Sequence, residues 1–497
     1  MSTTSATEAA PKPTRPGHGT QAPAALTSAS SGPQGLWAAP GPVHLVGIGG
    51  AGMSGLARLA AAAGYRVSGS DREESDALAA LRAAGIEARA GHDAAALPAG
   101  AAALVVSTAI PADNPELAEA RRRGLPVLHR SQLLAELMAG RRGLAVAGAH
   151  GKSTTSAMLV AALGDASAAV GATIAGGGGT GAVWGDGPWF VAEADESDRS
   201  LLNLSPEAAI LLNVDHDHHA TFASLEEVRE VFRAFVARLP SEGLLVVGPD
   251  DEARACASAA PCPVRLVGAL PGAWGRAERQ PGRAGFVLSL ADGRRFEVPL
   301  PLAGGHNADN AACALALADW CCVPPERAAA RLAGFAGVGR RMEPRGRAAG
   351  VEVVDDYAHH PAEIRATLAA ARERDPGRVV VVFQPHLPSR TRALGAELGA
   401  ALGGADVVVV TDVYLAREPP DPMATGRSVA DRVPPPARAV HAATLAEAAD
   451  AALAEVRPGD MLITMGAGDI THLGKELVAR LEKQSVDGDP DDRSRPA

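Results

Sequence analysis

The sequence predicts an α/β protein with three domains, and three observations carry this prediction. Short apolar strands alternate with small-residue helices from Val43 onward, a pattern typical of parallel sheets covered by helices. Glycine, alanine and valine are abundant while aromatic residues make up only 3%, which suits close helix–sheet packing better than a β-sandwich. A chain of 497 residues is also too long for one hydrophobic core.

The first domain is expected to span residues 39–141. A short apolar strand at Val43 leads through a glycine turn into a helix from Met53 to Ala63, and then into a second strand that ends at Ser70 and Asp71. This order is a βαβ unit. The remaining expected features of the domain are strands at 103–107 and 126–128 and a linker at 140–143.

Two further domains are expected at 142–334 and 335–484. Continuous apolar strands separated by helices indicate buried parallel sheets in both. The expected strands lie at 144–147, 189–192 and 209–213 in the second domain and at 351–354, 378–383, 405–410 and 461–465 in the third. Alternating residues at 286–290 and 295–298 predict an antiparallel excursion within 268–300.

Both ends of the chain are expected to be disordered tails. Residues 1–38 are rich in Pro, Ala, Ser, Gly and Thr without the apolar segment of a signal peptide. Residues 485–497 are rich in Asp, Arg and Pro. Elsewhere no apolar run reaches membrane-spanning length, so the sequence predicts no membrane partner.

Charge and cysteine content exclude several classes of function. The net charge of -10 argues against a surface for long nucleic acids. The five cysteines are odd in number and lack metal-ligand spacing with histidine, so neither a disulfide framework nor a zinc site is indicated. These features fit a protein of the reducing cytoplasm.

A first glycine turn, Gly47-Ile48-Gly49-Gly50-Ala51-Gly52, follows a strand and precedes a helix. In this context glycines let a diphosphate approach the helix N-terminus. Asp71 ends the next strand, where a ribose is usually bound. Taken alone, this motif would suggest NAD, and tight strand–helix packing also selects glycine.

A second glycine turn changes that interpretation. The segment Gly148-Ala149-His150-Gly151-Lys152-Ser153-Thr154 also follows a strand and opens a helix, and it carries the Lys-Ser pair of a nucleoside-triphosphate loop. Backbone N–H groups would hold phosphates, Lys152 would neutralise their charge, and Ser153 would offer an oxygen to Mg²⁺. The sequence therefore predicts an ATP site.

Carboxylates and histidines follow the next two strands of the second domain. The run Glu193-Ala194-Asp195-Glu196-Ser197-Asp198 comes directly after a strand, and carboxylates so close need a cation such as Mg²⁺. The second run, residues 213–219, contains His216, His218 and His219. One of these histidines is expected to help hold a divalent ion, and His216 or His219 to be a surface residue.

Taken together and in order, these motifs resemble those of the Mur ligase family, in the branch that adds L-alanine to UDP-N-acetylmuramate. The later motifs that carry the resemblance are residues 305–310 (GHNADN), 335–341 (FAGVGRR), 355–361 (DDYAHHP), 384–386 (QPH) and 389–391 (SRT). The resemblance spans about residues 43–472. It implies a Rossmann-like N-terminal domain, a central P-loop ATPase-like domain and a Rossmann-like C-terminal domain.

The resemblance also implies an activity and its site. The expected reaction joins L-alanine to the lactyl carboxylate of UDP-N-acetylmuramate through an acyl phosphate, consuming ATP with Mg²⁺, in peptidoglycan precursor synthesis. The UDP part is expected at Gly47, Gly49, Gly50, Gly52, Ser70, Asp71, Ser107 and Thr108. ATP is expected at Gly148, Ala149, His150, Gly151, Lys152, Ser153, Thr154, Asn307, Asn310, Arg341 and Asp356. The metal ligands are expected to be Ser153, Glu193 and His218, and the catalytic set Lys152, Glu193, His218, His359 and Arg390, with His359, His360 and Arg390 near the alanine and the reacting carboxyl. A monomer or a weak homodimer is expected.

The late motifs also have plain structural interpretations, and the chain departs from the family pattern in places. Asn307 and Asn310 could cap a helix, and His360 could begin one before a proline. Where the family usually has threonine, this chain has Ala149 and Ser153. Assigning the metal to His218 rather than His219 depends on the alignment at Asp217.

Three alternative functions remain open at the level of sequence. A recycling ligase of the same family would couple UDP-N-acetylmuramate to a ready-made tripeptide, although the form of the 50–53 turn favours the alanine enzyme. An NAD-dependent oxidoreductase would explain the first glycine turn but not the second. A nucleotide-binding regulatory protein without catalysis is disfavoured by the joint presence of Lys152, Glu193, His218 and Asp356.

Overall fold

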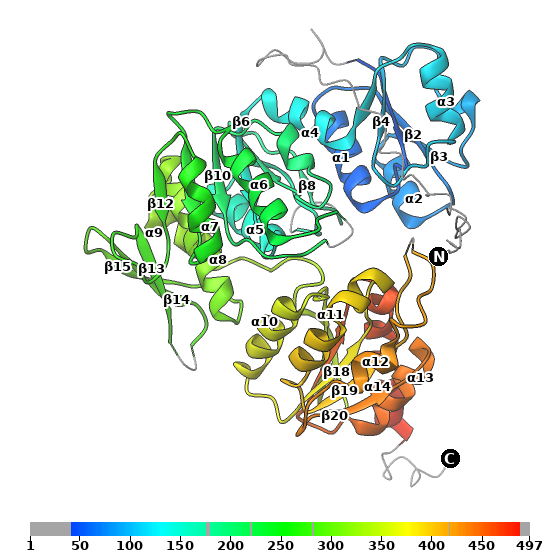
Figure 1. Cartoon of the computed structure of the whole chain (residues 1–497), viewed down its shortest axis with the longest axis vertical. Coiled ribbons are helices and arrows are strands. Elements are labelled where there is room, and N and C mark those ends of the chain that lie inside the picture. Colours follow the sequence, from blue (N-terminus) through cyan, green and yellow to red (C-terminus); the bar gives the residue numbers. More distant parts are fainter. Residues whose placement is uncertain (1–40, 175–178, 219–220, 281–282, 417, 488–497) are drawn as a thin grey trace, which may run out of the picture. The chain divides into compact units, whose positions relative to one another are not determined.

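The computed structural model describes residues 41–174, 179–218, 221–280, 283–416 and 418–487, which form four β-sheets with their helices (Figure 1). The predicted N-terminal tail, most of the predicted C-terminal tail and His219 lie outside the described residues. Among the described helices, none combines the length and the apolar character that crossing a membrane would require.

The first sheet is parallel throughout, in the order β3-β2-β1-β4-β5. Its strands are β1 (Val43–Val46), β2 (Val67–Asp71), β3 (Glu87–Ala90), β4 (Ala103–Val106) and β5 (Val127–His129). Its helices are α1 (Ala51–Ala62), α2 (Asp76–Ala83), α3 (Pro115–Arg122) and α4 (Arg130–Ala139). The strand order reverses between β1 and β4, so a crevice is expected at their carboxyl ends. The glycine turn after β1 lies at this point.

The second sheet has the order β12-β11-β10-β6-β9-β7-β8, and all its neighbours are parallel except β7 and β8. Its strands are β6 (Arg142–Ala147), β7 (Ser167–Ala169), β8 (Ala182–Val183), β9 (Trp189–Glu193), β10 (Ala208–Leu211), β11 (Leu244–Val247) and β12 (Val264–Leu266). Its helices are α5 (Lys152–Leu163), α6 (Leu225–Val236), α7 (Asp251–Cys256), α8 (Gly305–Trp320) and α9 (Pro325–Leu332). The order reverses at β6, next to β10, and the second glycine turn follows β6.

An antiparallel sheet of three strands interrupts the second α/β set, as the alternation of residues predicts. Its strands are β13 (Gly275–Arg279), β14 (Phe286–Leu290) and β15 (Arg295–Val298). Apolar side chains of β14 pack with those of α5 and α8 in one core.

The last sheet has the order β16-β17-β21-β18-β19-β20, and only the β16–β17 pair is antiparallel. Its strands are β16 (Glu343–Ala348), β17 (Val351–Asp356), β18 (Val379–Phe383), β19 (Val407–Val410), β20 (Arg438–His441) and β21 (Met461–Met465). Its helices are α10 (Pro361–Arg372), α11 (Pro388–Leu402), α12 (Gly426–Ala430), α13 (Leu445–Glu455) and α14 (Leu473–Asp487).

Helices cover both faces of the three larger sheets, so the α/β prediction is confirmed. In the last sheet, α10 to α12 pack on one face and α13 and α14 on the other. Such burial on both faces explains why the strands are apolar without alternation; β18, for example, is a run of four valines and a phenylalanine with all five residues buried. The polar side chains of the site therefore lie at the carboxyl ends of buried strands or directly after them, as Glu193 does at the end of β9 and Asp356 at the end of β17.

Candidate active site

The second glycine turn is shaped to leave the first amides of α5 open. Its N-cap, Gly151, has a φ of +84° and gives α5 no side-chain cap, a conformation that glycine adopts at no steric cost. A Cβ at this position would lie 3.0 Å from the amide nitrogen of Asn310. The loop is held by Asn213, which follows β10: its Oδ1 accepts from the N–H of His150 at 2.8 Å, and its Nδ2 donates to the carbonyl of His150 at 3.0 Å.

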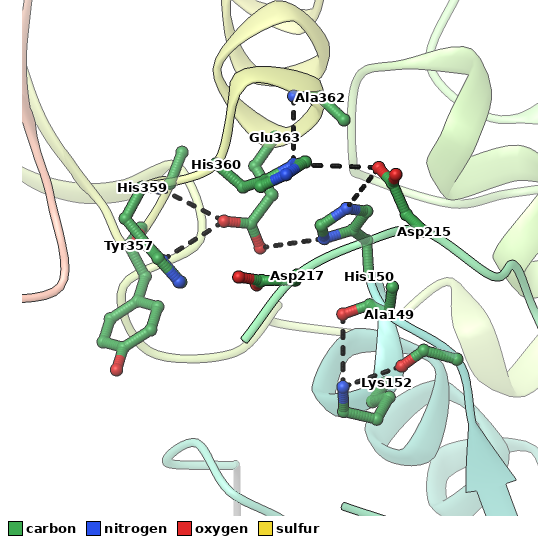
Figure 2. Close-up of polar contacts among 12 residues, drawn as sticks. Ala149, His150, Lys152, Asp215, Asp217, Tyr357, His359, His360, Ala362 and Glu363 are labelled. Atoms are coloured by element: carbon green, nitrogen blue, oxygen red, sulfur yellow. Dashed lines mark hydrogen bonds and ion pairs between the residues drawn. The ribbon is translucent and has the colours of Figure 1, made fainter. Parts of the chain in front are cut away.

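Lys152, the first residue of α5, points back across this loop (Figure 2). Its Nζ donates to the carbonyl oxygens of Gly148 at 2.7 Å and Ala149 at 3.2 Å, and to Glu196 Oε2 at 2.9 Å. Burial opposes the charged form, but the carboxylates of Glu196 and Asp195 outweigh it and raise the pKa of Lys152. Lys152 is therefore a fixed cation at the N-terminus of α5, which has no side-chain cap, and this combination suits the binding of phosphates.

Three of the four carboxylates in the acidic run at residues 193–198 are paired with cationic side chains of the protein. Arg130 Nη2 donates to Asp195 Oδ2 at 2.9 Å and lies 3.5 Å from Asp198 Oδ2, and Glu196 pairs with Lys152. The remaining carboxylate is Glu193.

The two carboxylate oxygens of Glu193 differ in their hydrogen bonding. Its Oε2 accepts from the backbone N–H of Gly171, while its Oε1 is buried without a hydrogen-bond partner among the described residues. Burial raises the pKa of Glu193, against the influence of Ser153 and Lys152. A buried unpaired carboxylate oxygen is costly unless a ligand occupies it, and a hard divalent cation suits an oxygen donor.

His218 and Asp217 connect this acidic end to α11. His218 Nε2 lies 3.2 Å from Glu196 Oε1. Burial of His218 disfavours the imidazolium, but the carboxylates of Glu196 and Asp217 together outweigh it and raise the pKa of His218. Arg390 Nη2 donates to Asp217 Oδ1 at 2.9 Å. Although burial alone would raise it, the pKa of Asp217 lies far below its usual value because Arg390 and His218 stabilise the carboxylate.

His359 is held as a neutral imidazole at the same place. Its Nδ1 lies 3.0 Å from the carbonyl oxygen of Tyr357 and 3.2 Å from Glu363 Oε2, which fits a proton on Nδ1 and leaves Nε2 as the acceptor. Burial lowers the pKa of His359 to about 4, and the nearby Arg390 adds to this effect while Glu363 opposes it. His359 is therefore uncharged at neutral pH.

His150, Asp215 and His360 form a cluster whose possible ligand atoms lie within 4.8 Å of one another (Figure 2). His150 Nε2 lies 3.3 Å from Asp215 Oδ2, and its Nδ1 lies 3.8 Å from Glu363 Oε1. Burial disfavours the imidazolium, yet these two carboxylates prevail and raise the pKa of His150 to about 9. His360 Nδ1 already accepts from the N–H of Ala362 at the start of α10. His150 is paired with two carboxylates and His360 caps α10, so in this structure the three side chains form an ion-pair cluster.

The predicted nucleotide residues line a second cavity, of about 1230 Å³, on the other side of the glycine turn. Its wall includes His150, Gly151, Thr154, Asn307, Asn310, Arg341 and Asp356. The two asparagines are not helix caps, since the N-cap of α8 is Gly304 without a side-chain bond; Asn307 Nδ2 donates to Ala303 O instead. Asp356 accepts from the N–H groups of Met342 and Ala358.

The first glycine turn is fixed by the end of β2. The N–H groups of Gly47 and Ile48 donate to the carbonyl of Ser70 at 2.8 and 2.9 Å, and that of Gly49 donates to Asp71 Oδ2 at 2.8 Å. The hydroxyl of Ser70 donates to Glu116, a fully buried carboxylate. Asp71 and Ser70 therefore act on the shape of the turn itself.

A cavity of about 790 Å³ collects most of the remaining predicted residues. Its wall includes Gly52, Thr108, Ala149, Lys152, Ser153, Glu193, His218, His359 and Arg390. Gly47, Gly49, Gly50, Ser70, Asp71 and Ser107 belong to the turn and strand ends of the first sheet without lining either cavity, and Gly148 lies behind the phosphate loop against Leu212 and Asn213.

The sequence did not single out four polar residues of the site. Arg130, Asp217 and Glu363 line the cavity of about 790 Å³, and Glu196 pairs with Lys152 and His218. Glu196 and Asp217 lie inside motifs already recognised, and Glu363 lies two residues after another, so only their pairing was missing. Arg130 had no local signal, because its partners come 65 and 68 residues later in the chain.

Family models match all three α/β sets. The model described as "Mur ligase family, catalytic domain" matches residues 42–142, "Mur ligase middle domain" matches 186–318, and "Mur ligase, glutamate ligase domain" matches 340–468. The chain belongs to the Mur ligase family, and membership implies that it uses ATP. The predicted three-domain Mur ligase architecture is confirmed, and an NAD-dependent oxidoreductase is excluded.

Relatives within the family are similar over nearly their whole length. The UDP-N-acetylmuramate–L-alanine ligase of Kineococcus radiotolerans is 50% identical over 457 residues, which cover 89% of this chain and 97% of the relative. The structure is similar to that of UDP-N-acetylmuramate-alanine ligase from Thermotoga maritima, with a TM-score of 0.75, 28% identity and coverage of 90% and 99%. A murein peptide ligase from Psychrobacter arcticus has a TM-score of 0.66, 25% identity and coverage of 89% and 98%.

Proposed function

We propose that the protein is an ATP-dependent ligase that joins L-alanine to the lactyl carboxylate of UDP-N-acetylmuramate, a step of peptidoglycan precursor synthesis. The observation that carries this proposal is the cavity of about 790 Å³, whose wall brings together Gly52 of the first glycine turn, Lys152 and Glu193 of the phosphate-loop region, and His359 and Arg390. The carboxylate of a nucleotide-linked acid, the γ-phosphoryl group of ATP and an amine can thus meet in one cavity.

The choice of alanine as the amine is supported by the relatives. Eight relatives named as L-alanine ligases are 44–50% identical to this chain. Among the solved structures, the alanine ligase of Thermotoga maritima has a TM-score of 0.75 and the murein peptide ligase of Psychrobacter arcticus one of 0.66. The tripeptide-recycling alternative keeps the same chemistry with a larger amine. Loss of catalysis, the third alternative, gains no support from a site in which Lys152, Glu193 and His218 line the same cavity.

Mg²⁺ belongs to the proposal because the side chains fit it. Glu193 contributes a buried oxygen without a partner among the described residues, beside Ser153 and on the same cavity wall as His218. Glu193, Ser153 and His218 would hold the ion, which would neutralise charge on the transferring phosphoryl oxygens.

In the first step, the lactyl carboxylate attacks the γ-phosphorus of ATP and ADP leaves. Lys152 holds the phosphates, while the amides at the N-terminus of α5 orient them. Arg341 is placed to reach the nucleotide, because it lines both cavities. The product is an acyl phosphate, whose phosphate is a far better leaving group than oxide.

In the second step, the uncharged amine of alanine attacks the acyl carbon, and phosphate leaves with one of the former carboxylate oxygens. Arg390 and His359 line the cavity where this happens. A neutral His359 with a pKa of about 4 is a weak base toward an ammonium group, so we assign it to orienting the amine, and positioning contributes most of the rate.

Location and assembly follow from the same proposal. ATP and a nucleotide sugar are reactants of the cytoplasm, so the protein would act there. A single chain supplies all the reactive side chains named above, so the proposed site is compatible with a monomer or a weak homodimer.

The proposal is tested with purified protein, ATP, Mg²⁺, L-alanine and UDP-N-acetylmuramate labelled with ¹⁸O in its carboxylate. The expected products are the alanine conjugate, found by mass spectrometry, and inorganic phosphate that carries one ¹⁸O. Conjugate formed without transfer of the label would contradict the acyl phosphate. Absence of the conjugate in the complete mixture would contradict the proposed function.

A further inference from the structure

Arg130 is a cationic side chain to which the proposed reaction assigns no role. It is the first residue of α4, directly after β5, and it lines the cavity of about 790 Å³. The other residues that α1, α4 and the β4 end contribute to this wall are neutral: Ala51, Gly52, Leu56, Leu59, Thr108 and Leu134, with Gly55. Arg130 therefore supplies the positive charge on the first domain's part of the wall.

The guanidinium is held through Nη2. Nη2 donates to Asp195 Oδ2 at 2.9 Å and lies 3.5 Å from Asp198 Oδ2. Neither Nη1 nor Nε has a protein acceptor among the described residues. Since a guanidinium carries five donors in a rigid plane, the two aspartates fix its orientation and leave the donors of Nη1 and Nε available.

The available Nη1 lies near the start of α1. Nη1 lies 3.9 Å from the position that a Cβ on Gly52 would occupy, and Gly52 is the second residue of α1, after an N-cap that makes no side-chain bond. A helix N-terminus and a guanidinium each favour anionic oxygens, and together they suit a diphosphate better than either does alone.

We infer that Arg130 binds the diphosphate of the UDP-linked substrate through Nη1, with Asp195 and Asp198 as positioning residues. The inference rests on the proposed function for the identity of the substrate. The acidic run then has two roles. Asp195 and Asp198 orient the arginine that holds the diphosphate, and Glu193, two residues before Asp195, lines the cavity in which the carboxylate is phosphorylated. Binding of the diphosphate therefore fixes the position of the substrate relative to the reaction centre.

The test compares the binding of UDP and of uridine by calorimetry to the full chain, without added magnesium. Arg130→Met should weaken UDP binding by about 10- to 100-fold, the range for loss of a charge-assisted contact, and leave uridine binding within about 2-fold. Arg130→Lys keeps the charge but loses the planar guanidinium that can bond Asp195 and the diphosphate at once, so it should weaken UDP binding by less. Arg121→Met, an exposed arginine on α3 of the same domain, is the matched control and should change neither.

Steady-state kinetics provide the second readout. In Arg130→Met the KM for UDP-N-acetylmuramate should rise while the KM values for ATP and L-alanine stay unchanged. Equal weakening of UDP and uridine, or unchanged UDP binding, would overturn the inference. If Arg130→Met does not fold, the lysine variant decides, because unchanged UDP binding in it would also overturn the planar contact. A wild-type protein that binds UDP but makes no conjugate would instead count against the proposed function alone.

Discussion

Arg390 Nη2 lies 2.9 Å from Asp217 Oδ1, although 173 residues separate the two in the chain. Their side chains are only 9% and 6% exposed. Asp217 follows β10 next to His218, while Arg390 lies in the first turn of α11. The pair therefore links the region expected to bind metal to the region expected to bind alanine, and its geometry should matter for the rate.

The Arg390–Asp217 pair should behave as a unit in a double-mutant cycle. Removing one partner of a buried ion pair leaves the other charge uncompensated, so Arg390→Met and Asp217→Asn should each lower kcat/KM for alanine strongly. The double variant should lose less than the sum of both, with a coupling of about 1–3 kcal/mol. Arg392→Met, whose partner Asp421 forms a mostly exposed pair, should have little effect. Additive losses would show that the pair is not functionally coupled.

Lys152→Ala should remove more than about 3 kcal/mol of transition-state stabilisation, judged from other phosphate clamps. The ammonium group is the cation at the glycine turn, and its loss also leaves the buried Glu196 with His218 alone. Steady-state phosphate release measures the effect. Lys475→Ala, an exposed lysine on α14, should retain full activity. Near-normal turnover of the Lys152 variant would defeat the assignment of the phosphate loop.

Glu193→Gln should raise the Mg²⁺ concentration for half-maximal activity by about 10-fold or more, because the variant replaces a charged ligand oxygen by an amide. Removing divalent ions with a chelator should abolish phosphate release, and Mg²⁺ should restore it. Glu207→Gln, which alters an exposed pair with Arg142, should leave the titration unchanged. An unshifted Mg²⁺ titration in the Glu193 variant would exclude it as a ligand.

Asp309→Asn should stabilise the protein, and the gain should depend on pH. Burial raises the pKa of Asp309 from 3.8 to about 6, and among the described residues its carboxylate has no hydrogen bond or ion pair. Between these values the folded state binds more protons than the unfolded state, so the wild type loses stability as pH rises through this window. Allowing for partial exposure, the cost above pH 7 is about 1–2 kcal/mol. Melting temperatures should therefore differ little at pH 4 and more at pH 7.5. A difference independent of pH would contradict the burial argument.

The sequence predicts well those strands and turns whose signal lies within a short stretch of residues. The limits expected at 286–290, 295–298 and 461–465 coincide with β14, β15 and β21, because alternation or a continuous apolar run marks these strands directly. Both glycine turns lie between a strand and a helix, as predicted, since that pattern occupies only about ten residues.

Edge strands and long-range pairs could not be predicted in this way. β3 (Glu87–Ala90) and β20 (Arg438–His441) each pair on one side only and keep exposed, polar residues, so they lack an apolar signature. The sequence identified the acidic run as needing a cation, but it could not tell that Arg130 and Lys152 neutralise three of the four carboxylates. Partners so far apart in the chain leave no pattern in either neighbourhood.

The most direct test of the central claim is phosphate release from ATP by the purified protein with Mg²⁺ and UDP-N-acetylmuramate, comparing L-alanine with L-Ala-D-Glu-diaminopimelate as the amine. The account predicts release that depends on L-alanine and not on the tripeptide. Release that depends on the tripeptide instead would contradict the claim and make the protein a recycling ligase, and release with neither amine would contradict the ligase function itself.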